Sequence, residues 1–262
     1  MIERFSYSSI ETYKKCPAQF RFRYIDKVVK KDEGIEAFMG KRVHEALQYL
    51  YDEILGSQLP FFDRVIEKYH EVWESHWHDR IAIVRRENSV KFYYELGERC
   101  VAAYYRKHSP FSEMVIGTEV EFVFSIDNSD DYIMKGIADR IDHDGNGNYE
   151  IHDYKSGKRA MNQYNADRDS QLAIYQVALE QSKSDVSSVK LVWHFLQHNL
   201  EVHSKRSSSQ IIQLVKETKS RIDEIRGHIQ NGGSFTPKES ILCNWCYYWE
   251  ECSAKDGTNP YI

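Results

Sequence analysis

Two acidic side chains and a lysine stand close together in the middle of the sequence, in segments with the alternating pattern of β-strands. Asp139 ends the tetrapeptide GIAD, and Asp153 and Lys155 belong to the tripeptide DYK. Asp153 and Lys155 share one face of their segment, because side chains alternate between the two faces of a strand. Paired carboxylates with a nearby lysine can bind a divalent metal and assist the attack of water on a phosphate.

The segment between these strands predicts how they pair. Asp144-Gly145-Asn146-Gly147 is a strong hairpin-turn signal. A turn centred on Asn146 pairs residues whose numbers sum to about 292 and places Asp139 opposite Asp153, with Cβ atoms roughly 5 Å apart. Two carboxylates this close repel each other unless one is protonated or a cation lies between them. Hard oxygen ligands favour Mg²⁺ or Mn²⁺ as that cation.

The alternative interpretation of each residue is ordinary. A D-x-K tripeptide alone usually marks a solvated strand end, and it is the facing Asp139 that favours a metal site. Asp142 has the opposite parity to Asp139, so solvation near the turn is its expected environment. Gln171 and Tyr175 share a helix face and can reach the same site, although an ordinary helix with a buried tyrosine has the same pattern. His44, taken alone, is a core or surface histidine.

Hydrophobic periodicity predicts the elements that position these residues. Ser8 with Glu11 has the form of a capping box, and Pro17 suits the first turn of a second short helix that runs to about Tyr24. Apolar residues recur at helical spacing and then at strand spacing. The expected helices are 37–54, 61–78, 89–106, 167–182 and 207–230, and the expected strands are 115–125, 131–142, 148–155, 188–196 and 198–204.

This order of elements predicts a single α/β domain over residues 1–262. It consists of a helical part at 1–110, a β-sheet core at 111–205 and a C-terminal helix with a cysteine-bearing segment at 206–262. The chain has 262 residues, of which 41% are hydrophobic and 13% aromatic, enough for a sizeable core. There is no signal-peptide pattern and no apolar run of ~18 residues, so we expect a cytoplasmic protein without a membrane anchor.

Charge is unevenly distributed along the chain. The formal net charge is -5. Residues 1–42 nevertheless contain ten Lys or Arg side chains against six Asp or Glu. Such a cluster is either a solvated surface or a phosphate-binding surface. We expect the basic residues of 14–31, together with Arg140 and Lys158 near the hairpin, to guide a nucleic-acid backbone.

Taken together, these motifs resemble the PD-(D/E)XK nuclease superfamily, and specifically its RecB-like branch. The likeness rests on His44 in GKRVHEAL, on GIAD, on DYKSGK and on QLAIY, in this order, and extends over roughly residues 5–252. It implies a restriction-endonuclease-like core, a central mixed β-sheet flanked by helices, with an N-terminal helical region and a C-terminal cysteine-rich tail. The second acid is Asp153, where several relatives carry Glu.

The resemblance also implies roles for individual residues. Asp139 and Asp153 would be metal ligands, with His44 as a further ligand and the backbone carbonyl of Tyr154 completing the set. Lys155 would be the catalytic lysine. Gln171 and Tyr175 match the Q-x-x-x-Y element, which lies beside the site in this family and contacts DNA phosphates or supports the lysine.

The cysteines suggest a second centre. Cys243, Cys246 and Cys252 supply three thiolates over a short stretch, and Cys16 can provide the fourth ligand that a tetrahedral or cubane site needs. The resemblance here is to the iron–sulfur subset of RecB-like nucleases, such as the AddB nuclease domain and the nucleases of CRISPR spacer acquisition. It implies a [4Fe-4S] cluster, with structural Zn²⁺ as the alternative. Cys100 fits a buried position within a helix.

The resulting prediction is a Mg²⁺- or Mn²⁺-dependent DNA nuclease. It would be an exonuclease on single-stranded or frayed DNA, acting in DNA repair, recombination or CRISPR adaptation with protein partners of those processes. A non-catalytic DNA-binding or assembly subunit built around the iron–sulfur clamp is the alternative of a different class. A zinc-bearing RNA-processing enzyme is a third possibility.

Overall fold

A mixed five-stranded sheet forms the centre of the computed structural model, which describes residues 2–262. The strand order is β3-β4-β5-β6-β7, and only the β5–β6 pair is parallel. A separate two-residue parallel pair joins β1 (Glu33–Gly34) to β2 (Ile81–Ala82). The strands of the main sheet are β3 (Val115–Ser125), β4 (Ile133–His143), β5 (Asn148–Lys155), β6 (Ser188–Phe195) and β7 (Leu200–Ser204).

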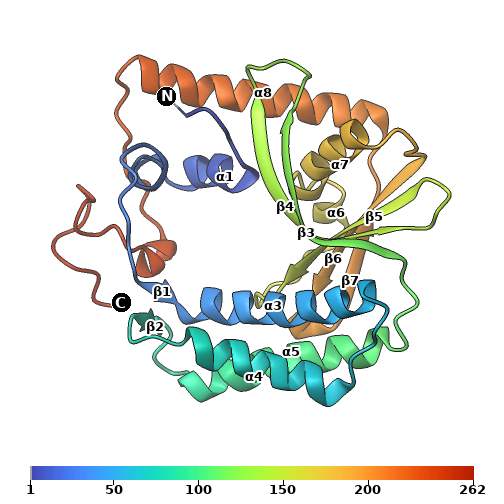
Figure 1. Cartoon of the computed structure of the whole chain (residues 1–262). Helices are drawn as coiled ribbons and strands as arrows, with labels where there is room; N and C mark the ends of the chain where they lie inside the picture. Colours follow the sequence, from blue (N-terminus) through green and yellow to red (C-terminus); the bar gives the residue numbers. More distant parts are fainter. Residues whose placement is uncertain (1) are drawn as a thin grey trace.

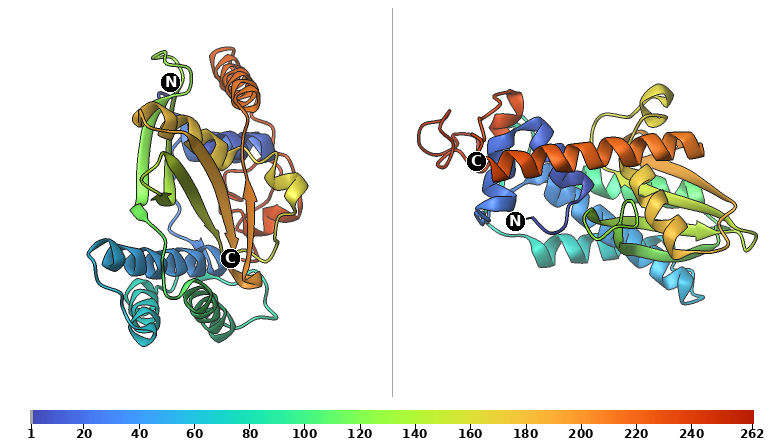
Figure 2. Two further views of the ribbon diagram at one scale, coloured as in Figure 1. Left: turned by 90° about the vertical axis from the view of Figure 1, so that its right-hand side faces the viewer. Right: turned by 90° about the horizontal axis from the view of Figure 1, so that it is seen from above.

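Helices cover both faces of this sheet (Figures 1 and 2). Three long helices form one layer, in which α3 and α5 contact the sheet and α4 packs against both of them (Figure 1). The helices α7 and α8 lie on the other side. The bounds are α3 (Ile35–Leu55), α4 (Phe62–His76), α5 (Val90–His108), α6 (Gln163–Ala166), α7 (Gln171–Ser182) and α8 (Ser208–Gln230).

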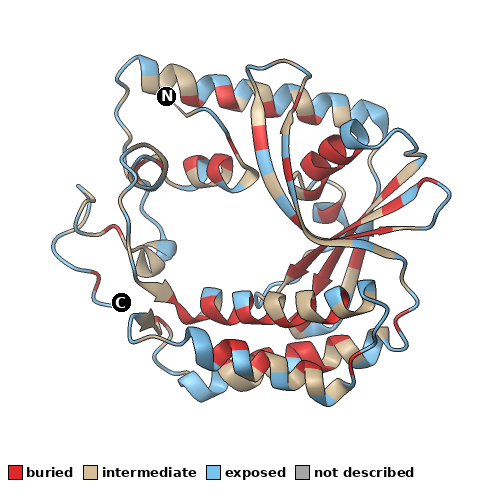
Figure 3. Ribbon diagram, viewed as in Figure 1, coloured by how far each residue is buried: buried red, intermediate tan, exposed pale blue. Residues whose placement is uncertain are grey.

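Two hydrophobic clusters, one on each side, hold these layers together. The first packs α7 and α8 on the sheet around Trp193 and Leu172, which are fully buried. The second packs α3, α4 and α5 together around Tyr51 and Tyr69 and reaches the sheet at Tyr154. The buried residues in Figure 3 lie along the sheet and on the inward faces of α3 and α7. This arrangement confirms the α/β fold with a central mixed sheet and flanking helices.

The N-terminal segment crosses one end of the molecule and meets the C-terminal segment there (Figure 1). It contains α1 (Tyr7–Lys15) and α2 (Pro17–Phe20), and a π-helical turn (Arg21–Ile25) continues α2. Before α1, the backbone of Phe5 bonds to Ile133 and Lys135 of β4. No helix within residues 2–262 combines the length and apolarity needed to cross a bilayer.

The helix and strand predictions agree closely with these elements, with one clear error at the start of the chain. The capping box predicted from Ser8 and Glu11 is wrong, because Ser6 is the N-cap and Ser9 completes the box. Glu11 instead pairs with Lys14 at 2.6 Å on the helix surface. The helix predicted from residue 167 begins at Gln171, because a short helix and a turn occupy the preceding residues.

Candidate active site

The predicted register of the β4–β5 hairpin is confirmed. Arg140 pairs with His152, and each further pair toward the turn keeps the same sum of residue numbers. The next position outward brings Asp139 beside Asp153. There the Asp139 carboxylate oxygen Oδ2 accepts a hydrogen bond from the backbone N–H of Tyr154, at 2.6 Å. The turn contains Gly145 and Gly147 at φ 78° and 83°, angles that favour glycine and fix this short connection.

His44 reaches this position from helix α3. Its Nε2 atom lies 2.8 Å from the carbonyl oxygen of Tyr154, and its Nδ1 atom lies 3.6 Å from Oδ1 of Asp139. The histidine, the Asp139 carboxylate and the Tyr154 carbonyl therefore converge from a helix and two strands. The structure thus brings together three of the four groups that the family resemblance implied as ligands, whereas the fourth, Asp153, contacts Lys155 and Gln171.

Asp153 and Lys155 form the other half of the site with Gln171. The Lys155 ammonium lies 2.9 Å and 2.7 Å from the two carboxylate oxygens of Asp153. Gln171 begins α7 and bridges the pair, because its amide nitrogen donates to Asp153 and its amide oxygen accepts from Lys155, each at 2.9 Å. The lysine is thereby held at a fixed distance from the carboxylate before any substrate is present.

Tyr175 lies one helical turn after Gln171 and packs against β4. A Cβ atom added at Gly136 would lie 2.2 Å from the Tyr175 ring carbon Cε1, so only glycine leaves room for this ring. Tyr175 is 7% exposed and lines, with Gln171, a cavity of about 580 Å³. It is therefore both a packing residue and part of the wall beside the acids.

Sequence reasoning missed one acidic residue, Glu119. The β3–β4 ladder pairs Thr118 with Arg140 and Val120 with Ala138, which leaves Glu119 beside Asp139. One ligand atom each of His44, Glu119 and Asp139 lie within 4.8 Å of one another. Glu119 also has φ 44°, a left-handed conformation that is rare for residues with side chains and often marks functional sites. The expected strands 115–125 and 131–142 are neighbours in the sequence. Pairing them with each other could have indicated that Glu119 lies near Asp139.

The electrostatics of the site favour an added cation. Burial and then the neighbouring Asp153 charge raise the pKa of Asp139 to about 8. Burial and then Asp139 also raise the pKa of Glu119. For Lys155, burial acts to lower the pKa, but the Asp153 carboxylate outweighs it and the net pKa is raised. The acids therefore repel one another, while the lysine stays protonated.

The donor set fits a hard divalent metal. The Oδ2 atom of Asp153 is buried and has no hydrogen-bond partner among residues 2–262, although the Lys155 ammonium lies near it. Carboxylate and carbonyl oxygens with one imidazole are ligands that Mg²⁺ and Mn²⁺ accept. His44, Asp139 and Glu119 offer ligand atoms within 4.8 Å of one another, with the Tyr154 carbonyl 2.8 Å from His44, and these groups would hold such an ion. Asp153, whose oxygens contact Lys155 and Gln171, would be a further ligand from the neighbouring strand.

Two expectations for residues near the hairpin are wrong. Arg140 cannot guide nucleic acid, because it is 1% exposed and lies against the ring of Tyr51, 4.3 Å from its centroid. Asp142 is not solvated near the turn, because it is 7% exposed and accepts a hydrogen bond from the Arg140 guanidinium at 3.0 Å. The face opposite Asp139 is covered by α3 and α5, so it is a buried polar layer. Lys158, which was expected to guide nucleic acid together with Arg140, is exposed.

Two cavities reach residues of the site. The cavity of about 580 Å³ is lined by Arg4, Lys135 and the N-terminal residues of α1 as well as by Gln171 and Tyr175. A second cavity, of about 480 Å³, is lined by Lys41, His44 and Glu119. Gln171 and His44 thus each connect the site to one of these cavities.

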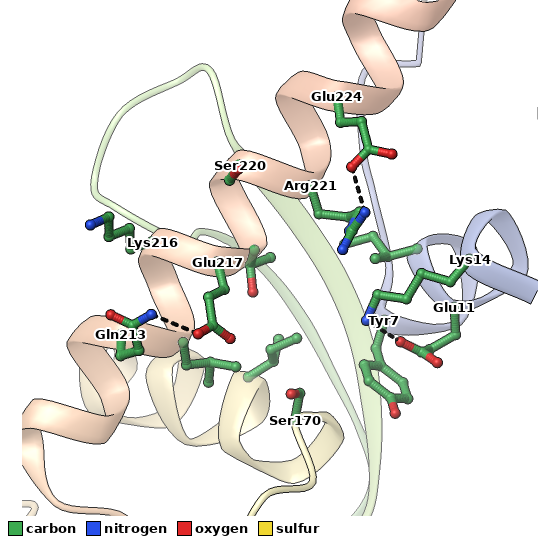
Figure 4. A pocket seen from close by; sticks show the side chains of 14 residues that line it. Tyr7, Glu11, Lys14, Ser170, Gln213, Lys216, Glu217, Ser220, Arg221 and Glu224 are labelled. Carbon is green, nitrogen blue, oxygen red and sulfur yellow. Dashed lines mark hydrogen bonds and ion pairs between the residues drawn. The ribbon is translucent and has the colours of Figure 1, made fainter.

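A third cavity, of about 340 Å³, lies between α1, α7 and α8 (Figure 4). Tyr7 lines this cavity too, and most of the charged side chains around the cavity are already paired with one another. Lys14 pairs with Glu11, Gln213 donates to Glu217 at 2.6 Å, and Arg221 pairs with Glu224. It offers no ligand set comparable to that of the acids on the sheet.

The four cysteines named as a second centre lie around one small cavity. Cys16, at the junction of α1 and α2, meets Cys243, Cys246 and Cys252 there, together with the indole of Trp249. All four are free thiols. Backbone N–H groups point at the sulfur atoms, from Lys238 to Cys16 at 3.4 Å and from Ser240 to Cys243 at 3.5 Å. Cys100 is 2% exposed within α5, which confirms its assignment to the core.

The basic residues of 14–31 are partly neutralised. Arg21 pairs with Asp26 at 3.0 Å, and Lys30 pairs with Glu250 and Glu251 in the C-terminal segment at 3.0 Å and 2.7 Å. These contacts tie the two ends of the chain together. Other basic side chains of the segment are exposed, namely Lys15, Arg23, Lys27 and Lys31.

Comparisons with known proteins agree with this geometry. The chain matches the model of the PD-(D/E)XK nuclease superfamily over residues 4–253. Among solved structures it is similar to a protein from Eubacterium rectale, provisionally described as an exonuclease, with a TM-score of 0.56 and 11% identity over 93% of this chain and 87% of that chain. It also matches SSO0001, with a TM-score of 0.37 and 14% identity over 92% and 96% of the two chains. No curated protein matches the sequence.

The likeness to the Eubacterium rectale structure concerns the fold, since so few residues are identical. The five-stranded mixed sheet with helices on both faces is the restriction-endonuclease-like core that the sequence predicted. The family model covers nearly the whole chain, including the strands that carry Asp139 and Asp153. The chain therefore belongs to the PD-(D/E)XK nuclease superfamily.

Proposed function

We propose that this protein is a metal-dependent deoxyribonuclease that hydrolyses phosphodiester bonds, with a preference for single-stranded or frayed DNA ends. Membership of the superfamily implies a phosphodiester hydrolase that uses divalent metal. The observation that carries the proposal is the position of Asp139, Asp153 and Lys155 on adjacent strands, with Gln171 bridging the last two.

A divalent ion bound by the acids would polarise the phosphate and provide a nucleophilic water at neutral pH. The protein's own side chains would stabilise the charge that develops during the reaction. The Lys155 ammonium is the cation nearest Asp153, and its raised pKa keeps it charged. It is therefore suited to stabilise the negative charge that develops on the phosphate oxygens, rather than to accept a proton. Gln171 restricts the lysine to this position.

The two flanking cavities support a polymeric substrate. A strand that lies in the Arg4 and Lys135 cavity and continues into the Lys41 cavity would pass Gln171 and His44, which line the two cavities. Arg4, Lys135 and Lys41 would neutralise phosphates along this path, and the ring of Tyr7 offers a surface for an unpaired base. The preference for ends draws support from the provisional description of the Eubacterium rectale protein as an exonuclease.

We further propose that the four cysteines hold a [4Fe-4S] cluster. Among residues 2–262, no three of their sulfur atoms come within 4.8 Å of one another. One tetrahedral zinc ion with Zn–S bonds of about 2.3 Å requires sulfur atoms only about 3.8 Å apart. A four-iron cube binds each thiolate through a different iron, so it accommodates thiolate sulfur atoms that lie farther apart. Structural zinc remains the alternative. Roles in DNA repair, recombination or CRISPR adaptation, with partners of those processes, belong to the same proposal.

A digestion assay tests the proposed activity. The purified protein is incubated with end-labelled linear single-stranded DNA, linear duplex and covalently closed circular DNA, with Mg²⁺, with Mn²⁺ or with chelator. We expect metal-dependent degradation of linear DNA, fastest for single strands, while the circle survives. Asp139→Asn, Asp153→Asn and Lys155→Ala should each lower the rate by roughly 10²-fold or more.

Asp63→Asn is the matched control, because Asp63 is an exposed acid in the first turn of α4, on the far side of the helical layer from the sheet. It should cleave at the wild-type rate. DNA binding without cleavage in every metal condition would instead identify a non-catalytic DNA-binding subunit. Degradation of RNA but not DNA would indicate the RNA-processing alternative.

A further inference from the structure

A second cluster of metal-ligand side chains lies on the face of the sheet opposite Asp153 and Lys155. His108 is the last residue of α5, His194 belongs to β6 and Glu201 to β7. One ligand atom from each of the three residues lies within 4.8 Å of the other two. Their side chains are 10%, 3% and 20% exposed, in that order.

The spacing of the donor atoms matches one tetrahedral ion. The Oε1 atom of Glu201 lies 3.2 Å from Nε2 of His108 and 3.7 Å from Nδ1 of His194. Zinc binds histidine nitrogen and carboxylate oxygen at about 2.0 to 2.2 Å, and two ligands at a tetrahedral angle are then about 3.4 Å apart. The two observed distances lie on either side of this value.

The two closest donor atoms lack a hydrogen bond. Nε2 of His108 and Oε1 of Glu201 are both buried, and neither has a hydrogen-bond partner among residues 2–262. They approach to 3.2 Å without the alignment of a hydrogen bond. Burying a ring nitrogen and a carboxylate oxygen without hydrogen bonds costs folding free energy unless a cation interacts with them.

Neighbouring groups contact the ring nitrogens that do not face Glu201. Nδ1 of His108 lies 2.8 Å from a carboxylate oxygen of Glu113, so it carries the proton and leaves the lone pair on Nε2. Nε2 of His194 lies 2.9 Å from Nδ1 of His152, and the Arg140 guanidinium lies 3.1 Å and 3.2 Å from the two ring nitrogens of His152. A proton on Nε2 of His194, donated to His152, leaves the lone pair on Nδ1, which faces Glu201. Carboxylate partners of this kind orient histidine ligands in metal sites.

We propose that His108, His194 and Glu201 bind a zinc ion. Two imidazoles and one carboxylate are a donor set that zinc accepts, with a fourth position left open. The ion would join the C-terminal end of α5 to two strands at the edge of the sheet. Tyr104 stacks on the His108 ring at 4.1 Å, and its hydroxyl lies 3.4 Å from that of Tyr154, so the joint lies directly behind the active-site strand.

The alternative is an ion-pair network without metal. The Lys107 ammonium lies 2.8 Å from the same Glu201 oxygen and can neutralise it, with a proton on His108 as the second cation. His203 contacts the other oxygen of Glu201, at 3.4 Å, and is 44% exposed. His203 contacts the same carboxylate but is not one of the three proposed ligands, so it provides a matched control.

Zinc counting distinguishes the two interpretations. Wild type, His108→Gln, Glu201→Gln and His203→Gln are equilibrated with excess zinc, dialysed against zinc-free buffer containing Mg²⁺, and measured by mass spectrometry of the metal. The cysteines and the acids on the sheet contribute equally in all four proteins, so the difference between variants isolates this site. We expect about one zinc less per chain in His108→Gln and Glu201→Gln, and the wild-type count in His203→Gln.

Equal zinc counts in all four proteins would overturn the proposal. If the variants do not fold, zinc-soaked crystals of the wild type decide the question. Anomalous scattering at the zinc edge should then give a peak within bonding distance of His108 Nε2, His194 Nδ1 and Glu201. A map with no peak at this position would equally overturn the proposal.

Discussion

The position of Asp139 favours metal binding but destabilises the metal-free protein. Its carboxylate is buried beside Asp153 and Glu119, and burial together with the Asp153 charge raises its pKa. A metal ion relieves this repulsion, whereas the metal-free protein relieves it by keeping a proton on the carboxylate. The same arrangement that recruits the ion therefore makes the site unfavourable without it.

This conflict predicts how the stability of the metal-free protein depends on pH. A carboxyl with a raised pKa in the folded state contributes stability that is fully present below its unfolded pKa and is lost as pH rises toward its folded pKa. In chelator, the melting temperature should therefore fall between pH 4 and about pH 8, the value to which the pKa is raised. Asp139→Asn should flatten this slope and melt higher than wild type at pH 8, by roughly 2–4 °C for each kcal/mol of repulsion removed.

The measurement is thermal unfolding followed by circular dichroism across that pH range. Asp63→Asn serves again as the control, because an exposed acid should leave the slope unchanged. If Asp139→Asn melts below wild type at pH 8 in chelator, the proposed repulsion is absent.

At the scale of elements, the site depends on how closely α7 approaches β4. Gly136 makes this approach possible, since a side chain there would overlap the Tyr175 ring. Tyr175 and Gln171 belong to the same helix, so a displaced ring also displaces the amide that holds Lys155. Close packing of this kind transmits a small steric change to the catalytic groups.

Gly136→Ala should therefore destabilise the protein by about 1–3 kcal/mol and reduce cleavage. Gly157→Ala is the matched control, because no atom lies within 4 Å of a Cβ added there. Urea unfolding and the cleavage rate are measured for both. An unchanged stability in Gly136→Ala would show that α7 can move away without consequence.

The hairpin shows what a sequence predicts well, and the neighbouring strand shows what it does not. A short turn with two glycines fixes the register of β4 and β5, so the meeting of Asp139 and Asp153 could be predicted from residue numbers. The connection from β3 to β4 is longer and carries no such constraint. Glu119 was missed for this reason, although it lies beside Asp139.

The environment of the opposite face could not be predicted from local pattern. Alternation separated Arg140 and Asp142 from Asp139, but it did not indicate what covers them. The cover is supplied by Tyr51 of α3 and Tyr104 of α5, far away in the sequence. Polar residues on a strand were therefore assigned to solvent, when they form a buried network.

At the scale of the whole molecule, the two ends of the chain are joined around the cysteines. Cys16 lies at the junction of α1 and α2, and the other three cysteines lie in the segment after α8. Lys30 adds ion pairs between the same two segments. A cluster at this position would close a long loop and so reduce the entropy of the unfolded chain.

Protein purified without oxygen should accordingly show a broad absorption band near about 400 nm, which is typical of thiolate-bound iron. Cys16→Ser should remove the band and lower the melting temperature, whereas Cys100→Ala should keep the band because Cys100 lies within the helical layer. A colourless wild-type protein that contains zinc instead of iron would show that the cluster assignment is wrong.

The central claim is that acids from neighbouring strands bind one divalent ion together. Anomalous diffraction from crystals soaked in Mn²⁺ tests it most directly. We expect a manganese peak within bonding distance of Asp139 and Asp153, with the His44 imidazole and the Tyr154 carbonyl beside it. A map without manganese at these carboxylates, at a concentration that supports cleavage in solution, would show that they do not bind a shared ion.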